Sequence, residues 1–220
     1  MLLSGEAEVI GFEDGDGAPY LVRDPRSQLV AMVGRPAPEA IAEAVYRNQG
    51  GGVMLVQTPD ADYAAAALPD WTPGPAIIHV LGREPRLPAV PEGTVRPVGR
   101  EEIAGHPELP PGLRSELLAA SGWSVVAGTI VDGKAVAFCY AASDTETLWD
   151  ISIDTLETYR RRGYASLAVA YMVEHMAAQG LRPVWGAGES NEASLALARK
   201  LGFEPVDHLV VFEPRAALSS

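Results

Sequence analysis

Three consecutive arginines and a glycine stand directly before a helix-like apolar stretch in the run YRRRGYASLAVAYM, residues 159–172. Arg160, Arg161 and Arg162 repel one another at this spacing, so an anionic group is expected beside them. Gly163 and Ala165 in the first helical turn would leave its N–H groups unpaired and pointing outward, at the positive end of the helix dipole. Together these features predict a seat for one phosphate-like anion, to which the arginines add charge and hydrogen bonds.

A second interpretation of the same run stays open. The arginines could be solvated surface charges, and Gly163 could serve only to let the helix pack closely against a neighbour. Two well-known phosphate-binding motifs do not decide the matter, because neither G-x-x-x-x-G-K-[ST] nor G-x-G-x-x-G occurs in the chain. The surrounding pattern is therefore needed to choose between an anion site and a solvated loop.

The composition predicts a soluble, cytoplasmic protein without a metal site. The 220-residue chain is 47% hydrophobic and 21% charged, and its formal net charge is −12. This charge repels nucleic acid. The chain begins without a cationic apolar leader and lacks an uncharged run of the ~18 residues that span a membrane. One cysteine, Cys139, and four histidines without paired spacing predict neither a disulfide nor a metal centre. A homodimer is left open.

The proline-rich stretch GREPRLPAVPEG separates two patterned halves and predicts a linker at residues 83–93. The expected organisation is an N-terminal α/β half at 1–82 and a larger α/β domain at 94–220. Helices are expected in the first half over PEAIAEAVYRN and DADYAAAAL. Strands are expected there over 19–23, 28–33, 53–57 and 76–81. The first half therefore predicts alternating strands and helices.

The second half predicts a mixed sheet with helices on both faces, which places the chain in the α/β class. A short strand and a proline-broken helical segment through Leu118 come first. Asp132-Gly133 would form a two-residue type I′ hairpin turn between two β-type runs. The strands are expected at 123–131, 134–142, 148–154, 183–186 and 206–212. One helix would run from Gly163 to near Gly180, and another from an Asn191 cap to Gly202.

The order of hairpin, strand, arginine loop, helix, strand and capped helix resembles the GNAT superfamily of N-acetyltransferases over residues 94–213. The most specific stretches are RRRGYA at 160–165, with the pattern R-x-x-G-x-A, and NEASLALARKLGF at 191–203. The run WDISIDTLETYRRRGYASLAVAYMVEHMAAQGLRPVW is similar to a bacterial subgroup that includes zwittermicin-resistance-type acetyltransferases. The first half repeats the order of elements, but its loop GRPAPEA lacks the arginine-glycine pattern. It is expected to be a GNAT-like half without a cofactor site.

The resemblance implies acetyl-coenzyme A (acetyl-CoA) as the acyl donor. The arginine loop would surround the pyrophosphate, and the strand before it would offer backbone groups to the pantetheine arm. Asn191 and Ser194 would contact pantetheine, although each could serve only the helix that begins there. The residues that the resemblance assigns to the donor are Ile153, Thr155, Arg160, Arg161, Arg162, Gly163, Tyr164, Ala165, Ser166, Asn191 and Ser194.

The implied reaction transfers an acetyl group directly from the thioester to a primary amine of a small molecule or peptide. An amine with the ordinary lysine pKa of about 10.4 must lose a proton, so a carboxylate base is expected. A strand N–H near Ile153 would bind the oxyanion of the intermediate. Asp150, at an acidic position of the subgroup, and Glu189 are the candidate bases. Each could instead be a structural charge, Asp150 in a salt bridge and Glu189 at a helix N-terminus.

Two residues depart from the pattern of the superfamily. Many members carry a tyrosine seven residues after the asparagine as general acid, where this chain has Ala198. Ribosomal-protein-type members carry a catalytic glutamate five residues before the asparagine, where this chain has Gly186. These departures leave a second function open, that of a non-catalytic acyl-CoA binding or sensing module.

Overall fold

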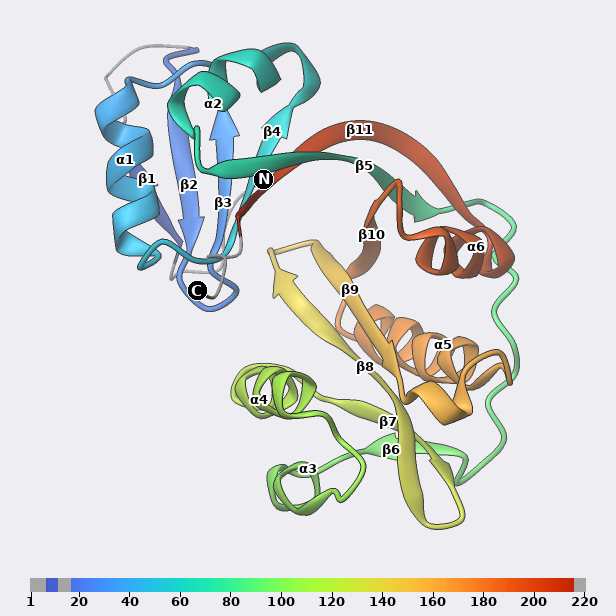
Figure 1. Cartoon of the computed structure of the whole chain (residues 1–220). Helices are drawn as coiled ribbons and strands as arrows, with labels where there is room; N and C mark the ends of the chain where they lie inside the picture. Colours follow the sequence, from blue (N-terminus) through green and yellow to red (C-terminus); the bar gives the residue numbers. More distant parts are fainter. Residues whose placement is uncertain (1–6, 12–16, 216–220) are drawn as a thin grey trace. The chain divides into compact units, whose positions relative to one another are not determined.

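The computed structural model of the chain describes residues 7–11 and 17–215 (Figure 1). Residues 1–6 and 12–16 belong to the N-terminal segment in which no leader is expected, and they lie outside the described residues. The residues group by their internal contacts into two compact units. Unit 1 comprises residues 1–78, 186–195 and 205–220, and unit 2 comprises 79–185 and 196–204. Each unit is therefore built from segments that are distant in the sequence.

Unit 1 contains a mixed sheet around its own core. Its elements are β1 (Glu8–Ile10), β2 (Tyr20–Asp24), β3 (Leu29–Val33), α1 (Pro38–Arg47), β4 (Val53–Gln57), a 3-10 turn (Thr58–Asp60), α2 (Ala61–Ala67), most of β5 (Trp71–Leu81) and the later part of β11 (Phe203–Pro214). β1, β2 and β3 pair antiparallel in succession, β3 pairs parallel with β4, and β4 pairs antiparallel with β11. The helix α1 connects the two parallel strands.

The pairing of β4 with β11 explains why the contact units differ from the expected sequential organisation. Leu209 to Phe212 of β11 lie opposite Gln57 to Met54 of β4, so the end of the chain completes the sheet of the first half. The contact units thus do not coincide with a division into 1–82, 83–93 and 94–220. A linker pattern in the sequence marks a local lack of regular structure but carries no information about which distant strands pair.

Unit 2 contains the arginine run. Its elements are β6 (Val95–Pro97), α3 (Arg100–Gly105), α4 (Pro111–Ala120), β7 (Ala127–Val131), β8 (Lys134–Asp144), β9 (Leu148–Thr155), a 3-10 turn (Glu157–Tyr159), α5 (Tyr164–Ala177), the start of β10 (Arg182–Gly188) and the end of α6 (Glu192–Leu201). Strands β6 to β9 pair antiparallel in succession, and β9 pairs parallel with β10. The helix α5 connects these parallel strands, as α1 does in unit 1.

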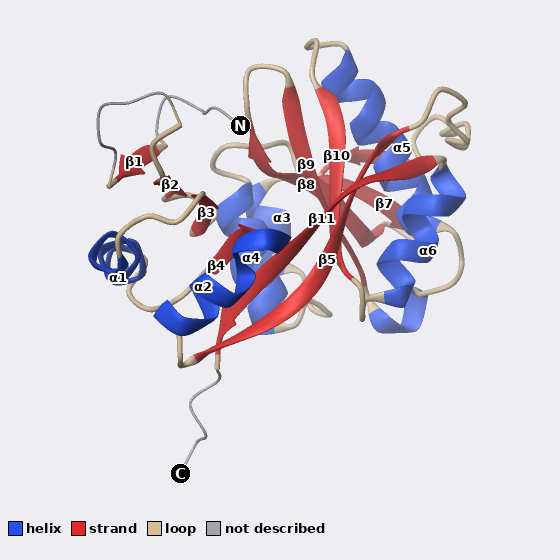
Figure 2. Ribbon diagram, turned by 90° about the horizontal axis from the view of Figure 1, so that it is seen from above, coloured by secondary structure: helices blue, strands red, loops and turns tan. Residues whose placement is uncertain are grey.

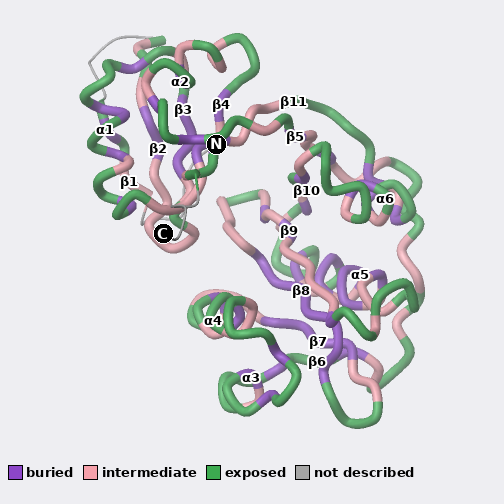
Figure 3. The backbone as a smooth tube through the Cα atoms, viewed as in Figure 1, coloured by how far each residue is buried: buried purple, intermediate pink, exposed green. Residues whose placement is uncertain are grey.

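Helices cover both faces of the unit 2 sheet (Figure 2). On one face, α5 packs against β7, β8 and β9. On the other face, Phe138 and Tyr140 of β8 pack with Ile103 of α3 and Leu117 of α4. The expected α/β class, with a mixed sheet and helices on both faces, is therefore confirmed. Buried residues gather in β7, β8 and α5, whereas the loop before α5 is exposed (Figure 3).

Several local predictions are confirmed by the backbone. Asp132 and Gly133 have φ values of 49° and 79°, the two positive values that a type I′ turn requires. The helix α5 is followed by Gly180 at φ 83°, a left-handed residue of the kind that ends helices. The side-chain oxygen of Asn191 accepts a hydrogen bond of 3.1 Å from the N–H of Ser194, which confirms the expected cap of α6.

Three strand predictions need correction. The strand expected from residue 123 begins at Ala127, because Trp123 and Ser124 follow α4 in a turn and hydrogen-bond to Ala141 through their side chains. The short strand β1 was missed within an acidic, glycine-rich stretch. The strand β5 begins at Trp71 instead of residue 76. It includes Pro73 and Pro75, although prolines usually interrupt strands.

No helix among residues 7–11 and 17–215 is long and apolar enough to cross a membrane.

Candidate functional site

The arginine loop begins α5 through two left-handed residues. Arg161 has φ 61° and Gly163, the residue that precedes α5, has φ 86°. A Cβ atom built on Gly163 would meet no heavy atom within 4 Å. The alternative that this glycine exists to permit close helix packing is therefore wrong. The glycine is required by its backbone conformation, and the space in front of it is open.

The first turn of α5 offers unpaired hydrogen-bond donors. The first intrahelical bond joins the N–H of Leu167 to the carbonyl of Gly163 at 3.4 Å, so the N–H groups between these residues have no intrahelical acceptor. No side chain caps this end of the helix. The hydroxyl of buried Thr129 on β7 donates to the carbonyl of Tyr164 at 2.9 Å and fixes the turn against the sheet. The result is a firmly held cluster of donors at the positive end of a helix dipole.

Ser166 adds a polar group that is buried without a partner. The residue is only 5% exposed, and its hydroxyl has no hydrogen-bond partner among the described residues. A buried hydroxyl that makes no hydrogen bond costs about 1–3 kcal/mol. Its position in the same first turn suggests that the partner is a ligand, in agreement with the predicted contact between Ser166 and a phosphate oxygen.

The three arginines are exposed, and two of them have contacts within the protein. The Nε of Arg160 donates to the carbonyl of Thr155 at 3.2 Å. The guanidinium of Arg162 lies 5.7 Å from the centre of the Tyr159 ring. These contacts hold the loop against the end of β9, so the arginines contribute to the geometry of the loop as well as to its charge.

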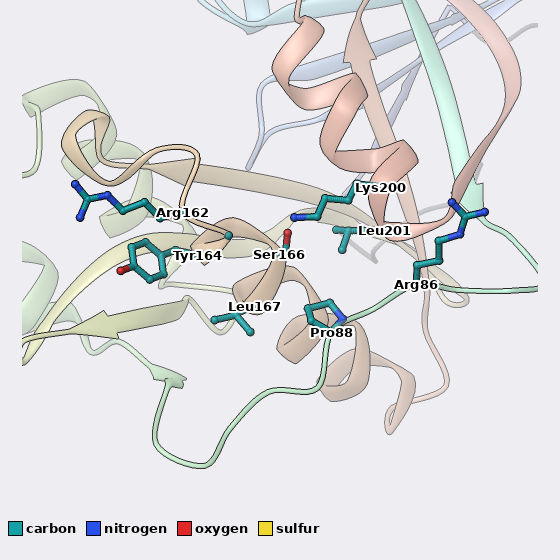
Figure 4. A pocket seen from close by; sticks show the side chains of 9 residues that line it. Arg86, Pro88, Arg162, Tyr164, Ser166, Leu167, Lys200 and Leu201 are labelled. Carbon is teal, nitrogen blue, oxygen red and sulfur yellow. The ribbon is translucent and has the colours of Figure 1, made fainter.

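A pocket of about 320 Å³ lies beside the first turn of α5 (Figure 4). Its walls come from the arginine loop and α5, the end of α6 and the segment after β5. The lining residues are Arg86, Pro88, Arg162, Gly163, Tyr164, Ser166, Leu167, Lys200 and Leu201. The structure thus brings Arg162, Gly163, Tyr164 and Ser166 of the predicted donor site together. The mixture of cationic and apolar walls suits a molecule with both a phosphate and an apolar part.

Two cationic lining residues, Arg86 and Lys200, were missed by the sequence analysis. The N–H of Arg86 donates to the carbonyl of Leu201 at 2.9 Å. A Cβ on Gly202, which has φ 87°, would lie 3.0 Å from that same nitrogen, so the close approach requires glycine. The proline-rich linker is therefore a packed wall of the pocket. The only available signal was the sequence pair Leu201-Gly202, which indicated a helix end but not what lies against it.

The last residues of β9 carry backbone groups directed away from β8. The N–H of Leu156 donates to the carbonyl of Val136 at 2.9 Å, and β9 continues this register, with Thr155 opposite Ala137. Because hydrogen-bonded pairs alternate in an antiparallel ladder, the backbone groups of Ile153 and Thr155 point to the other edge of β9. The pairs of β9 with β10 end at Asp150 and Val184. This edge can therefore offer backbone groups to a ligand, as predicted for Ile153 and Thr155.

The two candidate bases lie in different units. Asp150 is half-buried on β9 in unit 2, at the last residue pair with β10. Glu189 lies in unit 1 between β10 and α6, where one oxygen is 3.7 Å from Nδ1 of His208 and the side chain is 46% exposed. Its backbone N–H donates to the carbonyl of Pro75 at 2.8 Å. These contacts favour the structural alternative for Glu189.

Several residues in and around α6 that the resemblance singles out have structural roles or lack an ionisable group. Asn191 is exposed and caps the helix, and Ser194, also in unit 1, is half-buried. Ala198, at the position where many superfamily members have a tyrosine, is fully buried in unit 2. Gly186 is exposed, and a Cβ there would make an ordinary contact of 3.5 Å with Ile78. The chain thus lacks an ionisable side chain at both positions.

A second polar cluster on β9 was missed by the sequence analysis. The buried hydroxyl of Tyr140 donates to Glu116 of α4, and Tyr140 lies opposite Ser152 of β9. Burial, together with the hydrogen bond to Glu116, raises the pKa of Tyr140. Asp154 lies two residues further along β9, on the same face. Burial and the negative charge of Glu116 raise the pKa of Asp154, and Arg160 opposes this shift.

The corresponding loop of unit 1 differs in its chemistry. Arg35 donates from Nε to Asp60 at 2.8 Å, so its charge is neutralised within the unit. Pro38 occupies the first turn of α1, where it supplies no N–H donor. The hydroxyl of Tyr63 donates to the carbonyl of Pro36. These features agree with the expectation that the first half lacks a cofactor site.

Within the described part of the chain, no group of three His, Cys, Asp or Glu residues is placed to hold a metal ion.

Residues 122–212 match the model of a family described as GNAT acetyltransferase. Among solved structures, a GCN5-related N-acetyltransferase-like protein from Streptococcus suis is 17% identical, with a TM-score of 0.64 over 96% of this chain and 89% of that one. An acetyltransferase from the GNAT family of Novosphingobium aromaticivorans is 18% identical, with a TM-score of 0.61 over 89% of each chain. Comparison with curated proteins finds no match.

A tandem GNAT protein from the clavulanic acid biosynthesis pathway is similar in structure over nearly all of this chain. It is 14% identical, with a TM-score of 0.56 over 98% of this chain and 86% of that chain. Together with the family match, these structures confirm the resemblance to the GNAT superfamily and the expected fold with a preceding GNAT-like half. The narrower resemblance to zwittermicin-resistance-type enzymes stays a prediction.

The raised pKa of Asp154 predicts a pH-dependent effect of Asp154→Asn on stability. Ionising this carboxyl costs more in the folded protein than in the unfolded chain, so the cost is complete above the folded pKa and absent below the unfolded pKa. Asp154→Asn should raise the free energy of unfolding at neutral pH, and this gain should vanish as the pH falls toward about 4. Urea unfolding at several pH values measures both effects.

The same substitution at the exposed hairpin residue, Asp132→Asn, is the control for the change of an aspartate to an amide. A variant Asp154→Asn that is less stable than the parent at neutral pH would contradict the expectation. It would mean that the attraction to Arg160 outweighs the cost of burying the charge.

Proposed function

Because residues 122–212 match the GNAT acetyltransferase family model, we propose that the protein transfers an acetyl group from acetyl-CoA to a primary amine. The observation that carries the proposal is the donor cluster at the start of α5. Open space in front of Gly163, unpaired N–H groups and the partnerless hydroxyl of Ser166 lie together beside one pocket of unit 2. This combination suits the pyrophosphate of an acyl-CoA.

The donor would lie along α5 and β9 of unit 2. Its pyrophosphate would accept hydrogen bonds from the first turn of α5, where the charge and the dipole favour an anion. The pantetheine arm would bind the backbone groups of Ile153 and Thr155 on the free edge of β9. The bond between Arg160 and the carbonyl of Thr155 occupies part of that edge. Binding of pantetheine would therefore displace the side chain of Arg160 or share this carbonyl with it.

The reaction would proceed by direct attack of the amine. The neutral nitrogen forms a bond to the thioester carbonyl carbon, and the resulting oxyanion accepts a hydrogen bond from the N–H of Ile153. The bond between carbon and sulfur then breaks, and the CoA thiolate leaves and takes up a proton. Holding the amine and the thioester together supplies much of the acceleration. No covalent enzyme intermediate is needed.

Removal of the proton from the amine requires a base on β9. Asp150 is the predicted base. Asp154 lies on the same face of β9, and its raised pKa brings it closer to the working range of a general base. The net charge of −12 and the carboxylate of Glu116 near Asp154 favour a cationic acceptor over a neutral or anionic one. An amine of a small molecule or a peptide meets this requirement.

A specific observation favours the second function. Ala198 is fully buried and cannot protonate the leaving thiolate, which is the role of a tyrosine in many superfamily members. An acyl-CoA binding or sensing module would bind the donor with the same loop and would release no CoA in the presence of amines. Detection of free CoA thiol with a panel of primary amines separates the two functions.

Gly163→Asp and Gly163→Asn form a matched pair that tests the anion seat. Both side chains tolerate a left-handed backbone, and a Cβ at this position meets no neighbour. Both can also accept hydrogen bonds from the first turn of α5, so any loss of CoA affinity from this competition is common to the pair. The aspartate brings a negative charge to the expected pyrophosphate position. CoA should therefore bind the Asp variant more than about tenfold more weakly than the Asn variant. Titration calorimetry measures this difference, and thermal unfolding verifies that both variants fold. Equal affinities in two folded variants would contradict the proposed pyrophosphate site.

Asp150→Asn tests the predicted base, because it removes the proton acceptor with little change in shape. Turnover with the best amine should fall by about 10²-fold at neutral pH, while CoA affinity stays similar. Asp154→Asn measured beside it identifies which carboxylate of β9 acts as the base. Normal turnover in Asp150→Asn with a large loss in Asp154→Asn would show that Asp154 has this role. Asp132→Asn is the control, because Asp132 lies in the turn between β7 and β8 and is not opposite any residue of β9.

A further inference from the structure

One cationic side chain outside the arginine loop is directed toward the unpartnered hydroxyl of Ser166. Figure 4 shows the charged end of Lys200 extending toward Ser166, whereas the head groups of Arg86 and Arg162 point away from it. Lys200 lies in the last turn of α6 and is exposed. The pocket therefore brings an ammonium group and a buried hydroxyl from two different helices to one place.

The main chain around Lys200 is fixed by its neighbours. Leu201 is 1% exposed, and its carbonyl accepts a hydrogen bond from the N–H of Arg86. Gly202 ends the helix in a left-handed conformation, and the carbonyl of Gly202 accepts a bond of 2.9 Å from the N–H of Gly82. These two anchors, directly after Lys200 in the chain, thus define where the lysine side chain begins. Its four-carbon stem lets the ammonium reach into the pocket.

We propose that Lys200 and Ser166 together bind the pyrophosphate of the acyl donor, with Lys200 supplying the contacting positive charge. The proposal rests on the proposed function, since it concerns the same donor site. The hydroxyl of Ser166 would donate to one phosphate oxygen and the ammonium of Lys200 to an oxygen of the same group. The N–H groups of the first turn of α5 would complete the contacts.

The proposal assigns a different role to the arginine triplet from the one that the sequence indicated. Arg160 is bonded to Thr155, and Arg162 lies against the ring of Tyr159. Their charges raise the local positive potential, but these contacts hold the side chains of both, and the head group of Arg162 points away from Ser166 (Figure 4). Lys200 is already directed toward Ser166 (Figure 4).

The absence of a partner for Ser166 gives a signature that a structural serine would not have. In the free protein the buried hydroxyl makes no hydrogen bond, so Ser166→Ala should leave the melting temperature unchanged or raise it. The same change should weaken CoA binding, because it removes a donor to phosphate. A serine that only supports the helix would lose stability on substitution and keep its affinity once folded.

The decisive comparison is Lys200→Ala against Arg199→Ala, measured by titration calorimetry with CoA. Arg199 precedes Lys200 on the same exposed turn of α6 and does not line the pocket. Lys200→Ala should lose about tenfold or more in CoA affinity, as expected for one charge-assisted hydrogen bond, and Arg199→Ala should lose less than about twofold. Equal affinities of the two variants would overturn the proposal.

Two further arms locate the phosphate and separate this inference from the proposed function. Dephospho-CoA lacks the 3′-phosphate but keeps the pyrophosphate, so Lys200→Ala should weaken its binding as much as that of CoA. A loss confined to CoA would overturn the assignment to the pyrophosphate. If the unmodified protein binds neither ligand, the proposed function fails. If the unmodified protein binds both ligands but Lys200→Ala and Arg199→Ala have the same CoA affinity, the inference about Lys200 fails and the proposed function stands.

Discussion

The left-handed conformation of Gly163 is the constraint on which the candidate site depends. At φ 86° this residue turns the chain from the arginine loop into α5 without a side-chain cap, the space beside it is open, and the N–H groups of the first turn have no intrahelical acceptor. A residue with a Cβ would be strained there, and a capping side chain would occupy the donors that a ligand needs. The bond from Thr129 to the carbonyl of Tyr164 holds this turn against the sheet. The site is therefore positioned by backbone geometry, and charge is added around it.

The strand β9 leads to the start of α5, where the proposed anion site lies, and also carries two candidate bases, Asp150 and Asp154. Its alternation sends the backbone groups of Ile153 and Thr155 to a free edge, and it places Asp150 and Asp154 on the face that carries Tyr140 and Glu116. One strand can thus present hydrogen-bond donors to a thioester along its edge and carboxylates to an amine from one face. In the proposed reaction both substrates would meet along residues 150 to 155 of β9, which is consistent with direct transfer.

Much of the fold was predictable because its local signals are strong. The Asp132-Gly133 turn, the Asn191 cap and the glycine that follows α5 each follow from backbone preferences of single residues. The left-handed start of α5 after the arginines was predictable from Gly163 for the same reason. The presence of Lys200 and of the linker in the wall of the pocket was not predictable, because it depends on packing between residues 82–88 and the end of α6. The cluster of Glu116 and Asp154 also depends on tertiary contacts, which no spacing in the sequence indicates.

Unit 1 repeats the order of a strand, a helix and a parallel strand but not the chemistry of the loop. Arg35 is paired with Asp60, and Pro38 removes an N–H from the first turn of α1. The same topology can thus support two different helix starts, of which that of α1 offers fewer N–H donors than that of α5. This difference favours unit 2 over unit 1 as the place of the proposed donor site.

Amide hydrogen exchange with and without CoA, followed residue by residue, tests the central claim most directly. Amides without an acceptor exchange quickly, and a bound phosphate slows them. The account predicts that CoA protects the amides of residues 163–166 at the start of α5, while those at the start of α1 in unit 1 remain unchanged. Protection at α1, or unchanged exchange at 163–166 in the presence of saturating CoA, would contradict it.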